Sequence, residues 1–414
     1  MTVFGHSPGR AGLLGLGLAL ISGCSVIGPA ALRQSRLRYN ETIKTTSEEE
    51  MLLNIVRLRY TDTPSSLTVS NIAAQFELAA GLGASPFFAA GADRSFTSVL
   101  PQANVGGSDR PTFSLTPLDD SDFARRLFTP LSLDGILYLA KTTWPIQTVF
   151  RLYLENLNWV PNAQTASGPT PASAPPSSEF LEGMQALQVL QQRGDLVFGS
   201  EDKPRPTGAV VAAVTSESAV AAAQQGLEFV ATADGKGWRL QRSERQFVLH
   251  VNPSALDSTE MTTLRRIFNL KRSARFEVAV ESLTPFAPPP AGGFETFDLE
   301  TRSLLQALYF VSHGVQVPKE HLERGLARVT KRADGSAYDW EPVLRGLFQV
   351  KSEPGDCGDD GASVAVPYNG ACFFIDATDH DSRSTFALLM ELARLEVPTQ
   401  VARSPILTIP LGGR

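Results

Sequence analysis

The sequence lacks the motifs that identify most enzymes, and it contains few residues that bind metals. It has neither a Gly-x-Ser-x-Gly elbow nor a His-Glu-x-x-His pair, so a hydrolase would need a site assembled from distant residues. Only three cysteines and five histidines are present. The formal net charge of −6 and the lack of long basic runs argue against a nucleic-acid partner. We therefore expect no nucleic acid, no metal and no cofactor.

Long apolar runs are also missing. The apolar stretch near the N-terminus, Ala11–Leu20, is far shorter than the ~20 residues of a membrane-crossing helix. It follows a polar start that contains Arg10, and small residues come after it. A basic start, a short apolar core and small residues are typical of a secretory signal, so we expect residues 1–23 to be removed. The overall hydrophobic content of 43% indicates that the remaining chain folds around real cores.

The segment Ile21-Ser22-Gly23-Cys24 resembles the lipobox of bacterial lipoproteins. The resemblance implies that Cys24 is acylated and becomes the first residue of the mature chain. Ser25 follows it, where an Asp would signal inner-membrane retention, so the resemblance implies the outer membrane, on its periplasmic or surface face. Several lipid chains, at ~0.8 kcal/mol for each buried methylene, make such an anchor permanent. An ordinary signal peptide that contains a cysteine is the alternative.

The two other cysteines, Cys357 and Cys372, are predicted to form a disulfide. Extracytoplasmic compartments are oxidising, and closing a loop of about 15 residues would stabilise the fold by ~3 kcal/mol. A pair of metal ligands is the alternative, although no histidine lies between or beside the two cysteines.

Residues 66–100 carry the most unusual pattern. Apolar residues recur at every second position from Ile72 to Leu82, with small or polar residues between them. This period of two extends over about 12 residues, longer than the usual strand of ~5–6. Gly81–Pro86 predicts a turn, and Phe87–Leu100 a second strand. Two interpretations stay open: a sheet half covered by the helices that follow, or a hairpin that joins hairpins of other subunits in the wall of a transmembrane pore.

The alternation of helical and strand patterns predicts an α+β protein. We expect an N-terminal β-hairpin or sheet with helices packed on it, followed by a C-terminal mixed α/β region that contains an antiparallel hairpin. Asn369-Gly370 predicts a tight type I′ turn in that last hairpin. We expect a signal peptide at 1–23, a lipid-anchored tether at 24–45, an N-terminal α+β domain at 46–160, a Pro/Ser-rich linker at 161–178, a middle α/β domain at 179–284 and a C-terminal α+β domain at 285–414.

One group of side chains suggests chemistry. Asp376, Asp379, His380 and Asp381 crowd the end of a predicted strand, which invites a metal site or acid/base catalysis. Asp381 and Ser382 also stand where the N-cap of a helix over 383–395 is expected, and caps favour these residue types. Capping and turn formation are the favoured interpretation, and the four residues stay weak candidates for a site.

Three blocks of sequence together resemble a group of Gram-negative envelope lipoproteins that has no assigned activity. They are Leu52–Tyr60, Arg110–Thr112 with Thr116–Leu118, and Val364–Val366 through Asp381–Ser382. The resemblance covers most of the mature chain, and the cysteine pair and the Pro/Ser-rich insert depart from it. It implies an envelope location and transfers no catalytic residue. Because the chain offers packed modules, a permanent anchor and no evident chemistry, we expect a membrane-anchored envelope lipoprotein with a structural, binding or assembly role, whose partner is an envelope protein or further copies. A subunit of an oligomeric secretion pore is the first alternative, and a periplasmic hydrolase the second.

Overall fold

The protein is described by a computed structural model that covers residues 37–65, 67–89, 96–117, 125, 127–142, 144–284, 286, 290–358 and 361–396. The predicted signal peptide, Cys24 and most of the predicted tether lie outside these ranges. The described chain forms two compact units: residues 37–47 with 65–117, and residues 48–64 with 125–396. Helices and mixed sheets are both present, and a smaller antiparallel sheet lies near the C-terminus, so the predicted α+β class is confirmed.

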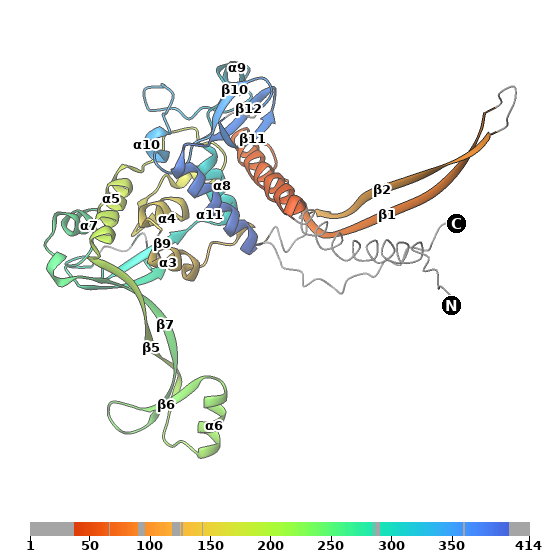
Figure 1. Cartoon of the computed structure of the whole chain (residues 1–414). Coiled ribbons are helices and arrows are strands. Elements are labelled where there is room, and N and C mark those ends of the chain that lie inside the picture. The colour runs from red at the N-terminus through yellow and green to blue at the C-terminus, as the bar shows by residue number, and fades with distance from the viewer. Residues whose placement is uncertain are drawn as a thin grey trace, which may run out of the picture. The chain divides into compact units, whose positions relative to one another are not determined.

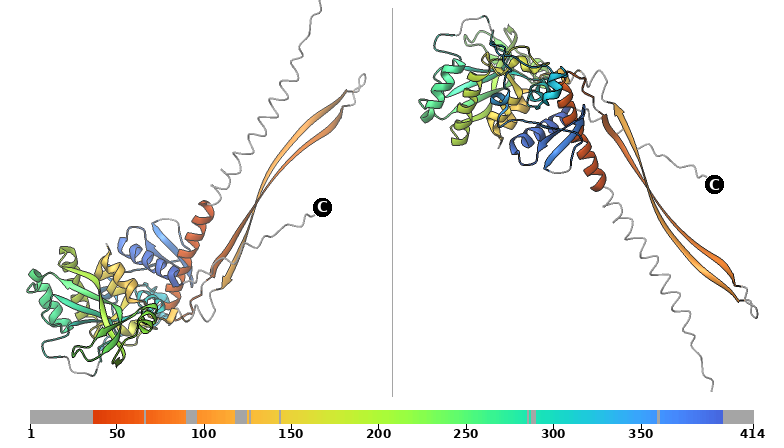
Figure 2. Two further views of the ribbon diagram at one scale, coloured as in Figure 1. Left: turned by 90° about the horizontal axis from the view of Figure 1, so that it is seen from below. Right: turned by 90° about the horizontal axis from the view of Figure 1, so that it is seen from above.

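The first unit contains a long β-hairpin. Strands β1 (Leu67–Ala89) and β2 (Phe96–Pro117) are antiparallel and twist about each other (Figure 2). Their register runs from Leu67–Pro117 to Ala89–Phe96, with one irregularity between Val69 and Asn71. The turn predicted at Gly81–Pro86 is wrong, because those residues lie inside β1. Glycine and proline indicate a turn only where the strand pattern stops, and here the alternation continues through them.

Residues 37–59 form one helix. Its predicted apolar stripe is confirmed, since Leu52, Ile55 and Val56 are fully buried. The predicted start at residue 46 is wrong: the Thr46 and Ser47 hydroxyls donate to backbone carbonyls one turn earlier, at 2.8 and 2.7 Å, instead of capping a new helix. Residues 37–45 are therefore helical, although the sequence assigns them to the tether.

The second unit is organised around a seven-stranded mixed sheet with the order β4-β3-β9-β8-β7-β5, and β6 also pairs with β7. Only β8 and β9 are parallel. The strands are β3 (Leu154–Leu157), β4 (Val160–Pro161), β5 (Leu196–Val211), β6 (Leu227–Ala231), β7 (Trp238–Val251), β8 (Arg275–Val280) and β9 (Thr296–Thr301). One sheet thus joins segments that the sequence assigns to three domains, so the boundaries predicted at 161–178 and 284 are corrected.

Helices close the core of the second unit (Figure 1). They are α3 (Leu133–Lys141), α4 (Ile146–Tyr153), α5 (Ser178–Arg193), α7 (Thr259–Phe268), α8 (Leu304–Ser312), α9 (Lys319–Glu323), α10 (Glu341–Leu344), α11 (His380–Glu396) and the short 3₁₀ helices η1 (Gln164–Ser167) and η2 (Pro253–Ala255). Helices α3 and α4 thus belong to the larger unit. Helix α5 contacts α7 closely at Gly183, where a Cβ would lie 2.4 Å from the Phe268 ring.

Strands β5 and β7 continue beyond the sheet as an arm, with β6 and α6 (Ser216–Gln224) at its far end (Figure 1). The arm buries little apolar surface: Ala222 is the one buried hydrophobic residue among residues 200–246. Val220 and Trp238 stay 58% and 40% exposed. Its shape therefore depends on strand pairing more than on a core of its own.

A second sheet has the order β10-β12-β11, with β10 (Lys351–Pro354), β11 (Ala362–Tyr368) and β12 (Ala371–Asp376). Asn369 and Gly370 join β11 to β12 with φ of 52° and 82°, as a type I′ turn requires. The hairpin predicted here is confirmed. Before this sheet, Val343 and Leu344 end helix α10, Val350 forms an isolated bridge with Val315, and the pairing of β10 begins at Lys351.

The Pro/Ser-rich segment 161–178 is not a linker, because it packs inside the larger unit. Asn162, Ala163 and Ala166 are fully buried. The Asn162 side-chain amide donates to the carbonyls of Arg151 and Leu154, at 2.8 and 2.7 Å. Composition suggests that such a segment forms no core of its own, but it finds its partners in residues far away along the chain.

Arg302 is the most important of these partners, and its side chain is fully buried. Nε donates to Ser167 Oγ at 2.9 Å and Nη2 to the Asn162 carbonyl at 2.6 Å. Nη1 donates to the Arg151 and Leu152 carbonyls at 3.0 and 3.2 Å. One guanidinium thus joins the start of α8 to the end of α4 and to η1.

Replacing Arg302 with Met should lower the free energy of unfolding by ~3 kcal/mol or more, since several buried acceptors lose their donor. Urea unfolding followed by tryptophan fluorescence measures the change. The exposed Arg266 serves as the control, and Arg266→Met should change stability by no more than ~0.5 kcal/mol. Equal effects of the two substitutions would show that the Arg302 contacts are dispensable.

Candidate functional site

The acidic group near the C-terminus makes turn and capping contacts. Asp376 Oδ2 accepts from Lys351 Nζ at 2.6 Å, and Oδ1 accepts from the Thr378 hydroxyl and backbone N–H. The Lys351 contact, followed by those of Thr378, lowers the pKa of Asp376. The carboxylate of Asp379 accepts from the Ser382 backbone N–H at 3.0 Å and from its hydroxyl at 2.6 Å.

Helix α11 therefore begins at His380, and Asp379 takes the capping role expected of Asp381 and Ser382. His380 and Asp381 are exposed. Within the part of the chain that the structure describes, no group of three or more His, Cys, Asp or Glu side chains is arranged to hold a metal ion. The turn and capping contacts of Asp376 and Asp379 explain the positions of these two carboxylates, and no catalytic role is needed to explain them.

The disulfide lies close to this region. Cys357 and Cys372 are joined with an Sγ–Sγ distance of 2.03 Å and a Cα–Cα distance of 4.9 Å. Cys372 is buried in β12, and Cys357 belongs to the loop between β10 and β11. The bond ties this loop to the central strand of the small sheet.

Removing the disulfide with Cys357→Ser and Cys372→Ala should lower the free energy of unfolding by ~3 kcal/mol. Dithiothreitol should destabilise the native protein by a similar amount and leave the double variant unchanged. Thermal unfolding with and without reductant measures both effects. A native protein whose stability does not respond to reductant would contradict the prediction.

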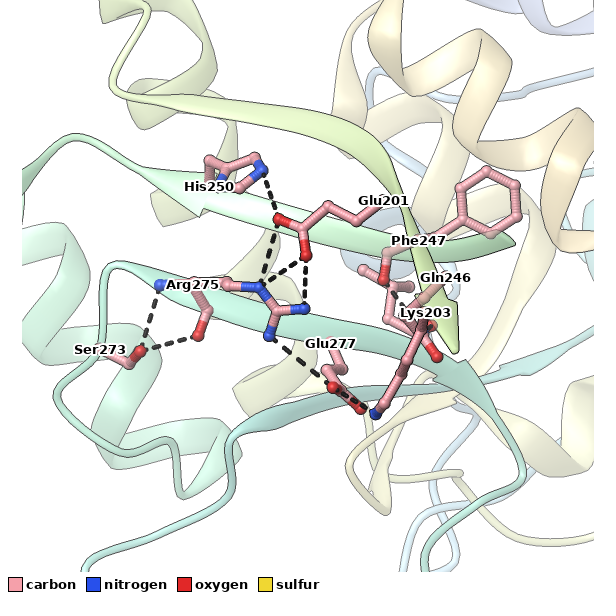
Figure 3. Close-up of polar contacts among 9 residues, drawn as sticks. Glu201, Lys203, Gln246, Phe247, His250, Ser273, Arg275 and Glu277 are labelled. Atoms are coloured by element: carbon pink, nitrogen blue, oxygen red, sulfur yellow. Dashed lines mark hydrogen bonds and ion pairs between the residues drawn. The ribbon is translucent and has the colours of Figure 1, made fainter. Parts of the chain in front are cut away.

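A row of charges crosses the sheet at the root of the arm (Figure 3). Glu201 on β5 accepts three hydrogen bonds from Arg275 on β8: Nε donates to the two carboxylate oxygens at 3.3 and 3.1 Å, and Nη2 donates to Oε2 at 2.8 Å. Lys203 Nζ lies 2.7 Å from Glu277 Oε1, and His250 Nε2 lies 3.5 Å from Glu201 Oε1. The hydrogen bond with Arg275 lowers the pKa of Glu201. Signs alternate and all five side chains are partly exposed, so the row aligns strands and offers no uniform charge to a ligand.

A buried histidine lies beside a cavity of about 400 Å³, which is lined by Arg59, Trp340 and Leu344 among others. His313 is 4% exposed and stacks on Trp340 with a centroid distance of 4.3 Å. Within the described ranges neither ring nitrogen has a hydrogen-bond partner. Burial, followed by the charge of Arg59, lowers the pKa of His313 to about 3. The ring is therefore neutral near pH 7 and a weak base.

The nearby His321 lies in a different environment from His313. His321 Nδ1 lies 2.7 Å from the Tyr60 hydroxyl, and the two rings meet edge to face. Burial raises the pKa of Tyr60 to about 12, so the hydroxyl keeps its proton. The special environment of His313 has no signal in the sequence, because Arg59 and Trp340 come from distant segments.

Acid should destabilise the fold through His313. Its folded pKa lies below the ~6.5 of an unfolded chain, so below pH 6.5 the unfolded state binds a proton that the folded state does not. The free energy of unfolding should therefore fall by ~1.4 kcal/mol per pH unit between about pH 6 and 4. His313→Phe should flatten this part of the profile in urea unfolding at a series of pH values. The exposed His380 provides the control: if His380→Asn removed the same slope, the assignment to His313 would be wrong.

The hairpin of the first unit differs from these local contacts in scale. Each strand has more than twenty residues, and their register continues without a third strand within the described residues. Residues that pair directly share a face of the ribbon, so the register assigns each position to one of two faces. The outer edge of each strand carries backbone N–H and C=O groups that β1–β2 pairing leaves unused.

Comparison with known proteins adds no relative: no family model, no curated protein and no solved structure matches this chain significantly. Among the described helices, none is long and apolar enough to cross a membrane. The function is therefore argued from the chain's own geometry, and the hairpin is the feature of that geometry that local packing explains least.

Proposed function

We propose that this chain is a lipid-anchored envelope lipoprotein of the outer membrane with an assembly role, and that its copies join through their β1–β2 hairpins. The observation that carries this proposal is the two-stranded sheet with a register of more than twenty pairs. An isolated two-stranded ribbon is at best marginally stable in water. Its free edges are templates for further strands.

A second copy of the chain fits these edges. β1 has 23 residues and β2 has 22, so the β1 edge of one copy matches the β2 edge of the next in length. The two edges are different surfaces, and repeated contacts between different surfaces form either closed rings or open fibres. A ring of hairpins closes only with enough strands, and ~8 strands correspond to ~4 copies.

Attachment to a membrane follows from the N-terminal sequence. The likeness of Ile21-Ser22-Gly23-Cys24 to a lipobox supports acylation of Cys24, and Ser25 supports the outer membrane. The anchor confines all copies to one surface and raises their effective concentration, which favours assembly. The larger unit, with its arm, is then a folded body for contacts with envelope partners.

The native protein extracted in mild detergent should form particles of about four or more copies, because hairpin edges are satisfied only in an assembly. Light scattering gives the mass, and negative-stain imaging shows whether the particles are rings. A variant in which a short Gly/Ser connection replaces residues 66–117 should lose the assembly.

A second deletion, made in the arm instead of the hairpin, controls for a nonspecific loss of assembly. Residues 212–236 can be replaced by the same short Gly/Ser connection, because Val211 and Trp238, on either side, already pair. This variant should keep the assembly. Full-length protein that is monomeric, or hairpin-deleted protein that still forms rings, would refute the proposal.

A further inference from the structure

The charged residues of the hairpin lie in one narrow zone. β1 and β2 contain only three, Glu77, Asp109 and Arg110, and these occupy the neighbouring pairs from Gln75–Arg110 to Glu77–Ser108. The next twelve pairs, from Leu78–Gly107 to Ala89–Phe96, contain no charged residue. We call this charge-free part the distal segment, and the part from Leu67–Pro117 to Glu77–Ser108 the proximal segment.

The two faces of the distal segment differ in polarity. One face, here the apolar face, consists of Leu78, Ala80, Leu82, Ala84, Pro86 and Phe88 with Thr97, Val99, Pro101, Ala103, Val105 and Gly107. The other face, here the polar face, contains the polar residues Ser85, Ser98, Gln102 and Asn104 and the small residues Ala79, Gly81, Gly83, Ala89 and Gly106. Its large apolar residues, Phe87, Phe96 and Leu100, lie toward the Ala89–Phe96 end. Strands that separate lipid from a watery interior alternate in this way.

The length of the distal segment fits a bilayer. Twelve residues at ~3.3 Å each span ~40 Å along the strand, and a tilt of ~40° reduces this to ~30 Å. The apolar band of such strands is ~25 Å tall, and the hydrocarbon core is ~30 Å thick. The whole hairpin is about twice as long, so only a part of it can be in the membrane. Phenylalanines of the apolar face stand at both limits, Phe76 at one and Phe88 at the other, as aromatic girdles do.

We infer that the distal segment crosses the lipid bilayer, with its apolar face against lipid and its polar face lining a water-filled passage, while the proximal segment stays in water. Asp109 marks the limit, because it is the first charged residue on the apolar face. This inference rests on the proposed assembly, since hydrocarbon does not tolerate the unpaired backbone groups of a single ribbon. Neighbouring hairpins must therefore be joined edge to edge.

Three single cysteines in the full-length lipidated protein test the placement. Ala103→Cys lies on the apolar face of the distal segment, Gln102→Cys is its neighbour on the polar face, and Ala74→Cys lies on the apolar face of the proximal segment. Each is labelled with an environment-sensitive fluorophore in vesicles of phosphatidylcholine and phosphatidylglycerol. Quenching by doxyl lipids should be several-fold stronger at position 103 than at 102 and 74, where a water-soluble quencher should act instead.

Equal quenching at positions 103 and 102 would overturn the inference, and lipid quenching at position 74 would overturn the stated limit. The particle mass is measured on the same samples, which separates the two proposals. Particles without lipid contact at position 103 would refute membrane crossing but leave the assembly standing. Monomers would refute the assembly itself.

A charged residue introduced on the apolar face, once in the distal segment and once in the proximal segment, provides a second test. Leu82→Arg places it in the middle of the distal segment, and Ala74→Arg places it in the proximal segment. Leu82→Arg should reduce incorporation into vesicles by ~10-fold or more, because arginine is costly at the bilayer midplane, and Ala74→Arg should not. Unchanged tryptophan fluorescence confirms that the larger unit is folded in both variants. Incorporation of Leu82→Arg at the native level would contradict the inference.

Discussion

The larger unit depends on a buried positive charge that has backbone carbonyls, not a carboxylate, as its direct partners. Burial lowers the pKa of Arg302 to about 9, so the guanidinium is still charged at neutral pH, and the Phe310 ring lies 3.9 Å from it. Arg151 repeats the arrangement by donating to the Val343 and Arg345 carbonyls at 2.8 and 2.9 Å. These two side chains connect α4 with the segments around η1, α8 and α10. They explain why one body forms where the sequence suggests several domains.

Sequence reasoning succeeds where a local pattern decides the structure and fails where a distant partner does. The buried stripe around Ile55 and the turn at Asn369 follow from spacing and residue type alone. The turn expected at Gly81–Pro86 instead lies inside β1, because those residues pair with residues 99–104 of β2. The candidate site shows the same limit: capping near residue 380 could be predicted, but Asp379 fills the role. His313 is special only through neighbours that the fold supplies.

The two units differ in whether their polar groups find hydrogen-bond partners within the same unit. In the larger unit even the buried arginines find carbonyl acceptors within the same chain. In the hairpin the strands are long, pair only with each other within the described residues, and leave their outer edges for other partners. Under the proposed assembly, dependence on a partner is thus concentrated in one element. The folded body can be complete before assembly, and joining hairpins need not disturb it.

Prolines limit how the hairpin edges can pair. Pro86, Pro101 and Pro111 all belong to pairs in which the β1 residue has an even number, so the three prolines lie on one face of the hairpin. They also share one kind of pair, because hydrogen-bonded and non-hydrogen-bonded pairs alternate along antiparallel strands. Proline fits a paired strand where its missing N–H would point away from the partner, so each leaves a gap on the outer edge. Between Pro101 and Pro111 the β2 edge still offers donors to a neighbour. Such interrupted edges limit the registers in which a neighbouring hairpin can pair, which favours one fixed register in the proposed assembly.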